Sequence, residues 1–133
     1  AALGSSQLDR LNEYVTKRTE LANLYNERLK NSDLMLPVQH EDTQSSWHLY
    51  VIQVPKHRDH LPLFKKLIAK GIGVNLHYIP VHTHPFYKSL GFKLGTFPCA
   101  EDYYSRSISI PLYPTMKECD QFRVIDVLLE YFA

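Results

Sequence analysis

The sequence contains little cysteine, no long apolar run and no excess of charge of either sign. Two cysteines in 133 residues cannot form a disulfide framework, which is typical of a reduced intracellular protein. A net charge of +1 gives no reason to expect a nucleic acid or an anionic membrane as partner. No apolar run approaches the roughly 18 residues that a membrane span needs, and no basic-then-apolar leader opens the chain. We therefore expect a cytoplasmic protein with no nucleic-acid or membrane partner.

What is present is an ordinary globular composition, with 44% apolar and 22% charged residues. The length of 133 residues matches one domain, because domains cluster at roughly 100–150 residues. A chain of this length can bury a hydrophobic core without help from disulfides or metal ions. The chain opens at Ala1 without an initiator methionine, which indicates a truncated start.

Helical spacing dominates the chain from about Ser6 to Lys30. One apolar stripe consists of Leu8, Leu11, Val15, Ala22, Tyr25 and Leu29. A second stripe beside it consists of Leu3, Tyr14, Leu21 and Leu24. Two stripes on so long a helix indicate either packing on something besides this chain's own core, or one wide apolar face against a single core.

The remaining elements alternate between short strands and helices. We predict strands over residues 47–54, 74–76 and 107–110, and helices from Asp59 to Gly71 and over 85–90 and 99–106. Thr115 and Glu118 have the spacing of a capping box and would open a last helix. The order predicts an α+β fold, a small, mostly antiparallel sheet backed by helices. Residues 1–30 would form the long helix and residues 47–133 the small α+β domain.

Three histidines crowd together with the spacing H-x4-H-x-H, as His77, His82 and His84, with Tyr78 alongside. A zinc site would need further ligands, but the cluster has no cysteine or nearby acidic residue, and Pro80 breaks any helix through it. A loop with scattered polar side chains is a second interpretation. We favour ligand binding, because a strand end followed by a proline-bearing loop commonly offers hydrogen bonds to a sugar or phosphate.

The motifs of several other chemistries are missing. The sequence has no G-x-S-x-G elbow, no G-x-G-x-x-G turn and no G-x-x-x-x-G-K-[ST] loop. Nearly all the lysines lie among polar neighbours, so none is expected to have a pKa lowered by burial. The residues alone therefore predict an α+β domain with a polar binding loop over residues 75–87, and they name no reaction.

Five segments taken in order resemble the C-terminal domain of the DegT/DnrJ/StrS family of sugar aminotransferases. They are residues 1–8, 47–50, 71–82, 97–101 and 109–114. The sequence of residues 74–82, Val-Asn-Leu-His-Tyr-Ile-Pro-Val-His, most resembles that of one branch of the family. This branch aminates UDP-linked 4-keto-6-deoxy-N-acetylhexosamines on the way to pseudaminic acid-type sugars. Leu76 stands where the family more commonly has valine, and residues 83–86 vary a stretch that often reads Leu-Gln-Pro-Tyr, so the resemblance assigns no functional role to His84.

The resemblance implies the C-terminal domain of the aspartate aminotransferase fold, fold type I, whose long first helix joins a large and a small domain. It implies transfer of an amino group from glutamate to a nucleotide-linked 4-keto-6-deoxy sugar, for surface polysaccharide or glycan biosynthesis, by a homodimer with pyridoxal phosphate as cofactor. In that family the cofactor's lysine and phosphate cradle belong to the large domain. We therefore expect this chain alone to lack that domain, to hold no cofactor and to be inactive.

The matching motif implies that His77, Tyr78 and His82 face the substrate and hydrogen-bond to its sugar or diphosphate. Asn75 is a lesser candidate, since its side chain could instead satisfy the strand end. No catalytic or metal-binding residue is assigned. Two alternatives remain open at this point: a stand-alone α+β ligand-binding or regulatory module with a polar outer face on its first helix, and a histidine metal site.

Overall fold

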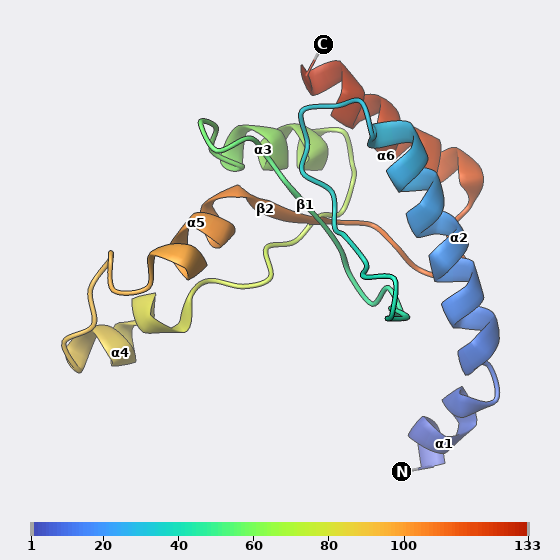
Figure 1. Cartoon of the computed structure of the whole chain (residues 1–133), viewed down its shortest axis with the longest axis horizontal. Helices are drawn as coiled ribbons and strands as arrows, with labels where there is room; N and C mark the ends of the chain where they lie inside the picture. The colour runs from blue at the N-terminus through green and yellow to red at the C-terminus, as the bar shows by residue number, and fades with distance from the viewer. Residues whose placement is uncertain (1, 133) are drawn as a thin grey trace.

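The structure is a computed structural model that describes residues 2–132 (Figure 1). Its strands are β1 (Tyr50–Gln53) and β2 (Ser107–Ile110). Its longer helices are α2 (Leu11–Leu29), α3 (Leu61–Ala69), α5 (Pro98–Arg106) and α6 (Glu118–Phe132). Shorter helical segments are α1 (Ala2–Leu8), the 3-10 turn η1 (Val81–Thr83) and α4 (Pro85–Ser89). Within the described residues, no helix is long and apolar enough to cross a membrane.

The two strands form a small antiparallel sheet at the centre of the molecule, with Tyr50 opposite Ile110 and Gln53 opposite Ser107. Each outer edge is extended by a single bridge, Met35 to Gln53 on one side and Asn75 to Ser109 on the other. The strand expected over residues 74–76 is therefore reduced to a single bridge at Asn75. The strand expected from Trp47 begins later, at Tyr50, since Trp47 has a left-handed backbone with φ of 48°.

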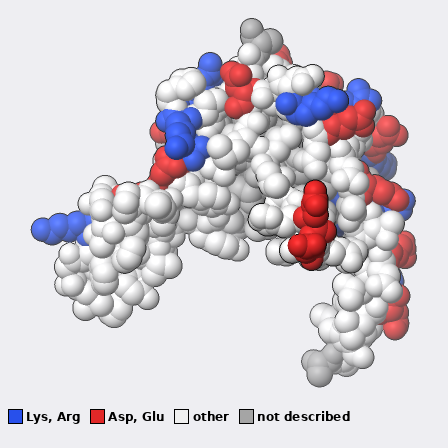
Figure 2. All heavy atoms as spheres, in the orientation of Figure 1, with Lys and Arg blue, Asp and Glu red and all other residues white. Residues whose placement is uncertain are grey.

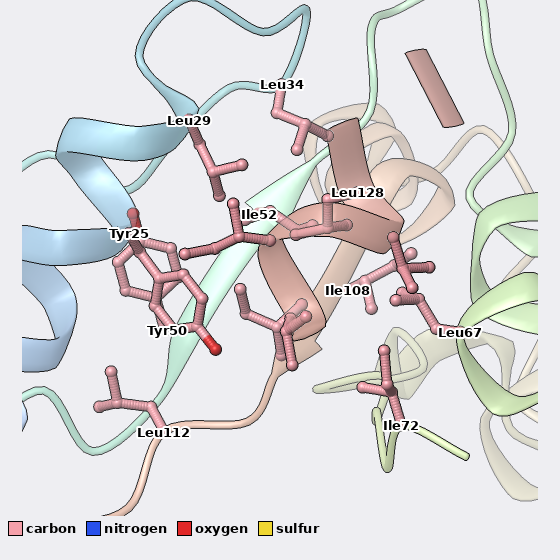
Figure 3. Close-up of a cluster of buried hydrophobic side chains, with 14 of the residues drawn as sticks. Tyr25, Leu29, Leu34, Tyr50, Ile52, Leu67, Ile72, Ile108, Leu112 and Leu128 are labelled. Carbon is pink, nitrogen blue, oxygen red and sulfur yellow. The ribbon is translucent and has the colours of Figure 1, made fainter. Parts of the chain in front are cut away.

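The core lies between this sheet and helices α2, α3 and α6 (Figure 3). Its fully buried members include Tyr25, Leu29, Tyr50, Ile52, Leu63, Leu67, Ile108 and Leu128. Burial raises the pKa of both Tyr25 and Tyr50, whose rings lie 5.0 Å apart. Both hydroxyls are nevertheless satisfied, because Tyr25 donates to the Pro111 carbonyl at 2.9 Å and Tyr50 donates to Asn26 at 2.5 Å.

The long first helix is interrupted once, by a turn at Asp9 and Arg10 between α1 and α2. Just before the turn, the Ser6 hydroxyl donates to the Leu3 carbonyl at 2.9 Å, a local bond of the kind that weakens a helix. Of the second stripe, Leu3 is 78% exposed, whereas Tyr14, Leu21 and Leu24 are half-buried. The second stripe is therefore bare only at its N-terminal end.

Helix α3 is terminated as the sequence predicts, by Gly71, which follows the C-cap Lys70 and whose φ of 72° suits glycine. The Gly71 N–H donates to the Ile68 carbonyl at 2.9 Å and the Ile72 N–H to the Leu67 carbonyl at 3.0 Å, which is the Schellman pattern. At the other end of α3, the Asp59 carboxylate accepts the Leu61 N–H at 2.8 Å. This tight stop turns the chain back toward the free edge of β2, where the candidate site begins.

The expectation of a capping box at the last helix is wrong. Helix α6 begins at Glu118, and the carbonyl of Lys117 accepts its first N–H bonds, from Asp120 and Gln121. Glu118 is thus the first residue of the helix rather than its third, so Thr115 lies too far back to cap it. The expected positions of α4, α5 and β2 agree with the structure to within one residue.

A limb that we call the arm, residues 81–97, projects from the core and contains η1 and α4 (Figure 1). In Figure 2 this limb shows little charge compared with the rest of the molecule. The sequence gives the reason, because no acidic residue occurs between Asp59 and Glu101. Several of the arm's large apolar side chains are exposed, among them Val81, Phe86, Leu90, Leu94 and Phe97.

Candidate functional site

The candidate segment starts at the free edge of β2, where Asn75 pairs with Ser109 through the backbone. The two N–H···O bonds of this pair measure 3.1 and 2.8 Å. The Asn75 side chain is engaged locally, because its Oδ1 accepts the N–H of Leu76 at 2.8 Å. Asn75 therefore begins the segment with its amide oxygen already used by the backbone, which is the alternative role that the strand end suggested.

His77 lies beside the same residue of β2. Its Nδ1 and the Ser109 hydroxyl oxygen are 2.7 Å apart and share a hydrogen bond whose direction depends on the histidine tautomer. The ring of Tyr78 packs edge-on against the ring of His77, with 4.7 Å between the centroids. His77 is half-buried, whereas Tyr78 is 75% exposed, so the tyrosine presents its ring and hydroxyl to solvent.

His82 occupies a different environment, in the turn η1 at the base of the arm. It is 6% exposed and packs edge-on against Phe97, with 5.0 Å between ring centroids. Its Nε2–H donates to the Glu101 carboxylate at 2.8 Å, since a carboxylate oxygen can only accept. The structure thus brings His77 and Tyr78 together at the sheet edge and places His82 against helix α5.

Glu101 collects several donors besides His82. The N–H of Gly95 lies 2.9 and 2.8 Å from the two carboxylate oxygens, and the N–H of Phe97 lies 3.3 Å from one of them. The Gly95 N–H bond, together with the His82 and Phe97 donors, holds the pKa of the Glu101 carboxyl below its ordinary value of 4.5. Partial burial acts in the opposite direction, but the donors prevail.

Helix α5 is in turn held to the sheet by Arg106. This buried guanidinium donates to both oxygens of Asp102, one turn earlier, at 3.3 and 2.6 Å. It also donates to the Val54 carbonyl at 3.2 Å, just after β1. The guanidinium lowers the pKa of the Asp102 carboxyl. The element that carries Glu101 therefore has a defined position relative to the sheet.

An apolar hollow of about 340 Å³ lies at the base of the arm. Its lining consists of Pro80, Val81, His82, Tyr87, Phe92, Phe97 and Ala100. A more voluminous hollow of about 430 Å³ lies near the end of α3 and the start of α6, and none of the candidate residues lines it. We place the candidate site at the arm, because the predicted segment lines that hollow and leads into it.

The described residues hold no cluster of three or more His, Cys, Asp or Glu side chains that could bind a metal ion. His84, the third histidine of the spacing, is exposed. The residues that sequence reasoning missed are Ser109 and Glu101, the partners of the two histidines. Glu101 did carry a signal, since it is the first acidic residue after a long run without one and follows a group of histidines.

Comparison with known proteins identifies the family of this chain. The sequence profile described as the DegT/DnrJ/EryC1/StrS aminotransferase family matches residues 1–129. The chain is 39% identical to the spore coat polysaccharide biosynthesis protein SpsC of Bacillus subtilis, over 96% of this chain and 34% of that protein. It is 34% identical to the UDP-4-amino-4,6-dideoxy-N-acetyl-beta-L-altrosamine transaminase of Campylobacter jejuni, over 96% of this chain and 34% of that protein.

Solved structures agree. DesV of S. venezuelae, in complex with a ketimine intermediate, superposes with a TM-score of 0.88 at 31% identity, covering 98% of this chain and 35% of that one. PseC of Helicobacter pylori, an aminotransferase involved in the biosynthesis of pseudoaminic acid, gives a TM-score of 0.84 at 27% identity, covering 98% and 36%. The chain thus spans about a third of the length of these relatives. The expected α+β fold, part of aspartate aminotransferase fold type I, is confirmed, and the chain belongs to the DegT/DnrJ/EryC1/StrS aminotransferase family.

Proposed function

We propose that this chain is the C-terminal part of a pyridoxal phosphate-dependent sugar aminotransferase. The complete enzyme would transfer an amino group from glutamate to a nucleotide-linked 4-keto-6-deoxy sugar, as a homodimer in the cytoplasm, for surface polysaccharide or glycan biosynthesis. The observation that carries this proposal is the family match over nearly the whole chain, residues 1–129. The names of two relatives, a spore coat polysaccharide protein and an altrosamine transaminase, support the sugar as acceptor.

Within that enzyme, the chain would form one wall of the sugar-nucleotide cleft. Tyr78 is the candidate best placed to contact a ligand, because its hydroxyl can donate and accept and its ring is exposed. His77 lies against that ring and can supply a second polar contact from its free Nε2. The apolar hollow at the base of the arm, which Pro80 and Val81 of the same segment line, suits an apolar part of the substrate.

Pyridoxal phosphate supplies an electron sink for amino transfer when it is bound. The described residues do not fit a site for its attachment. Eight of the nine lysines are exposed. The ninth, Lys66, is half-buried, and its ammonium group lies 3.5 Å from Glu130 and over the ring of Tyr131. None of them lies in a hollow with donors for a phosphate, so the cofactor would belong to a part of the enzyme outside these residues.

We expect the 133-residue chain to form no specific covalent adduct with pyridoxal phosphate, because its lysines are nearly all exposed and none is set apart from the others as an attachment site. The measurement is absorbance after mixing, followed by borohydride reduction and peptide mapping. Slow labelling scattered over many lysines agrees with the proposal. A stoichiometric adduct at one lysine would contradict it.

The gene upstream of the codon for Ala1 separates the proposal from a stand-alone binding or regulatory module. The proposal predicts that the reading frame continues upstream into a large domain with a cofactor lysine. A start codon immediately before Ala1, with a monomeric product that lacks transaminase activity, would support the module instead.

A further inference from the structure

The segment from His77 to His82 is held at both of its ends and exposed between them. His77 is bonded to Ser109 at 2.7 Å, and His82 is bonded to Glu101 at 2.8 Å. Both partners are on one continuous stretch, since α5 runs directly into β2. The segment therefore forms a bridge, residues 78–81, between two bonds to the same rigid part of the molecule.

The exposure of the side chains changes sharply along this bridge. Tyr78 is 75%, Ile79 51% and Val81 58% exposed, whereas His82 is 6% exposed. A buried histidine whose Nε2–H is already donated to a carboxylate has little left to offer a ligand from that atom. The segment can therefore offer a ligand only the exposed side chains of residues 78–81, and among these Tyr78 is the polar one.

Glu101 holds more than His82. The same carboxylate accepts the N–H groups of Gly95 and Phe97, so it joins the beginning of the arm at His82 to its end at residues 95–97. Three donors therefore converge on one side chain, and the Gly95 N–H is shared between its two oxygens. No other acidic residue occurs between Asp59 and Glu101, so none within the arm can replace it.

We propose that Glu101 is a positioning residue, which acts through His82 to hold the bridge in place and thereby presents Tyr78 to the sugar nucleotide. The identity of that ligand rests on the proposed function, whereas the positioning does not. Without the Glu101 carboxylate, His82 is released from α5, residues 95–97 separate from the base of the arm, and the bridge is held only at His77.

The positioning is tested on the 133-residue chain by amide hydrogen exchange. Glu101→Gln keeps the size of the side chain but removes its charge, and we expect exchange at Gly95, Phe97 and the bridge to become roughly tenfold faster or more. Asp102→Asn is the matched control, because it removes the neighbouring carboxylate and weakens the same helix without contacting the arm. It should leave exchange in the arm unchanged. Equal exchange in the arm of both variants would overturn the proposal.

Kinetics of the complete gene product test the link to the ligand. Glu101→Gln and Tyr78→Ala should both raise KM for the nucleotide sugar severalfold while leaving KM for glutamate unchanged, a pattern that general destabilisation would not produce. Glu101→Asp should not restore the wild-type KM, because the shorter side chain cannot reach all the donors. Faster exchange in the arm with an unchanged sugar KM would overturn the presentation of Tyr78. A wild-type product that transfers no amino group would instead overturn the proposed function and leave the exchange result standing.

Discussion

At the scale of single residues, the site depends on two side chains that hydrogen-bond to histidines far from them in the sequence. Ser109 and Glu101 follow their partners by 32 and 19 residues. The spacing of the histidines predicts a polar segment, but it does not tell a histidine that faces a ligand from one that holds the backbone. Only the burial of His82 and the exposure of Tyr78 separate these roles.

The depressed pKa of Glu101 predicts an acid-sensitive arm. A carboxyl whose pKa is lower in the folded than in the unfolded state stabilises the fold above its unfolded pKa, and this contribution is lost as the pH falls through the folded pKa. We therefore expect the NMR amide signals of Gly95 and Phe97 to shift with a midpoint below 4.5, the ordinary value for glutamate. Glu101→Gln should abolish that transition. A midpoint above 4.5 in the wild-type chain would mean that the donors do not stabilise the carboxylate.

At the scale of elements, the sequence predicts best where proline, glycine and periodicity coincide. Strand β2 has the predicted bounds, because the alternating residues Ser107–Ile110 end at a proline, Pro111. The termination of α3 by Gly71 is predicted equally well. The start of α6 is predicted wrongly. Thr115 and Glu118 have the spacing of a capping box, but the turn before the helix places Glu118 at its first position. The long-range bonds of Ser109 and Glu101 have no local pattern at all.

The left-handed conformation of Gly71 predicts a contrast between two nearby glycines. Gly71→Ala places a Cβ on a residue with φ of 72°, and we expect a loss of about 1–2 kcal/mol in the free energy of unfolding. That Cβ would also lie 3.4 Å from the Arg123 guanidinium. Gly73→Ala, where no atom lies within 4 Å of the added Cβ, is the matched control. Denaturant unfolding measures both, and equal losses would show that the Schellman turn does not limit stability.

At the scale of the whole molecule, two limbs leave a central core, the arm on one side and α1 with the first turn of α2 on the other (Figure 1). The second limb exposes Leu3 by 78%, Leu8 by 65% and Leu11 by 49%. An outer face with three exposed leucines differs from the polar one that a stand-alone module would have. The relatives are about three times as long as this chain.

The exposed leucines predict that the 133-residue chain self-associates at high concentration. Burying one leucine contributes about 1.5–3 kcal/mol, so covering three exposed leucines on one limb favours association of two chains. Sedimentation over a wide concentration range should show association that Leu8→Glu abolishes. Leu94→Glu, in an exposed leucine of the arm, should have no effect. A strictly monomeric chain, or association that only Leu94→Glu disrupts, would contradict the prediction.

Amino transfer to a nucleotide-linked sugar is followed most directly with labelled nitrogen. The complete gene product, loaded with pyridoxal phosphate, is incubated with glutamate labelled at its amino nitrogen and a UDP-linked 4-keto-6-deoxy-N-acetylhexosamine, and the sugar nucleotide is analysed by mass spectrometry. We predict that the label appears in the sugar nucleotide, and that Tyr78→Ala slows its appearance at low sugar concentration. A folded, cofactor-loaded product that leaves the sugar nucleotide unlabelled would contradict the account.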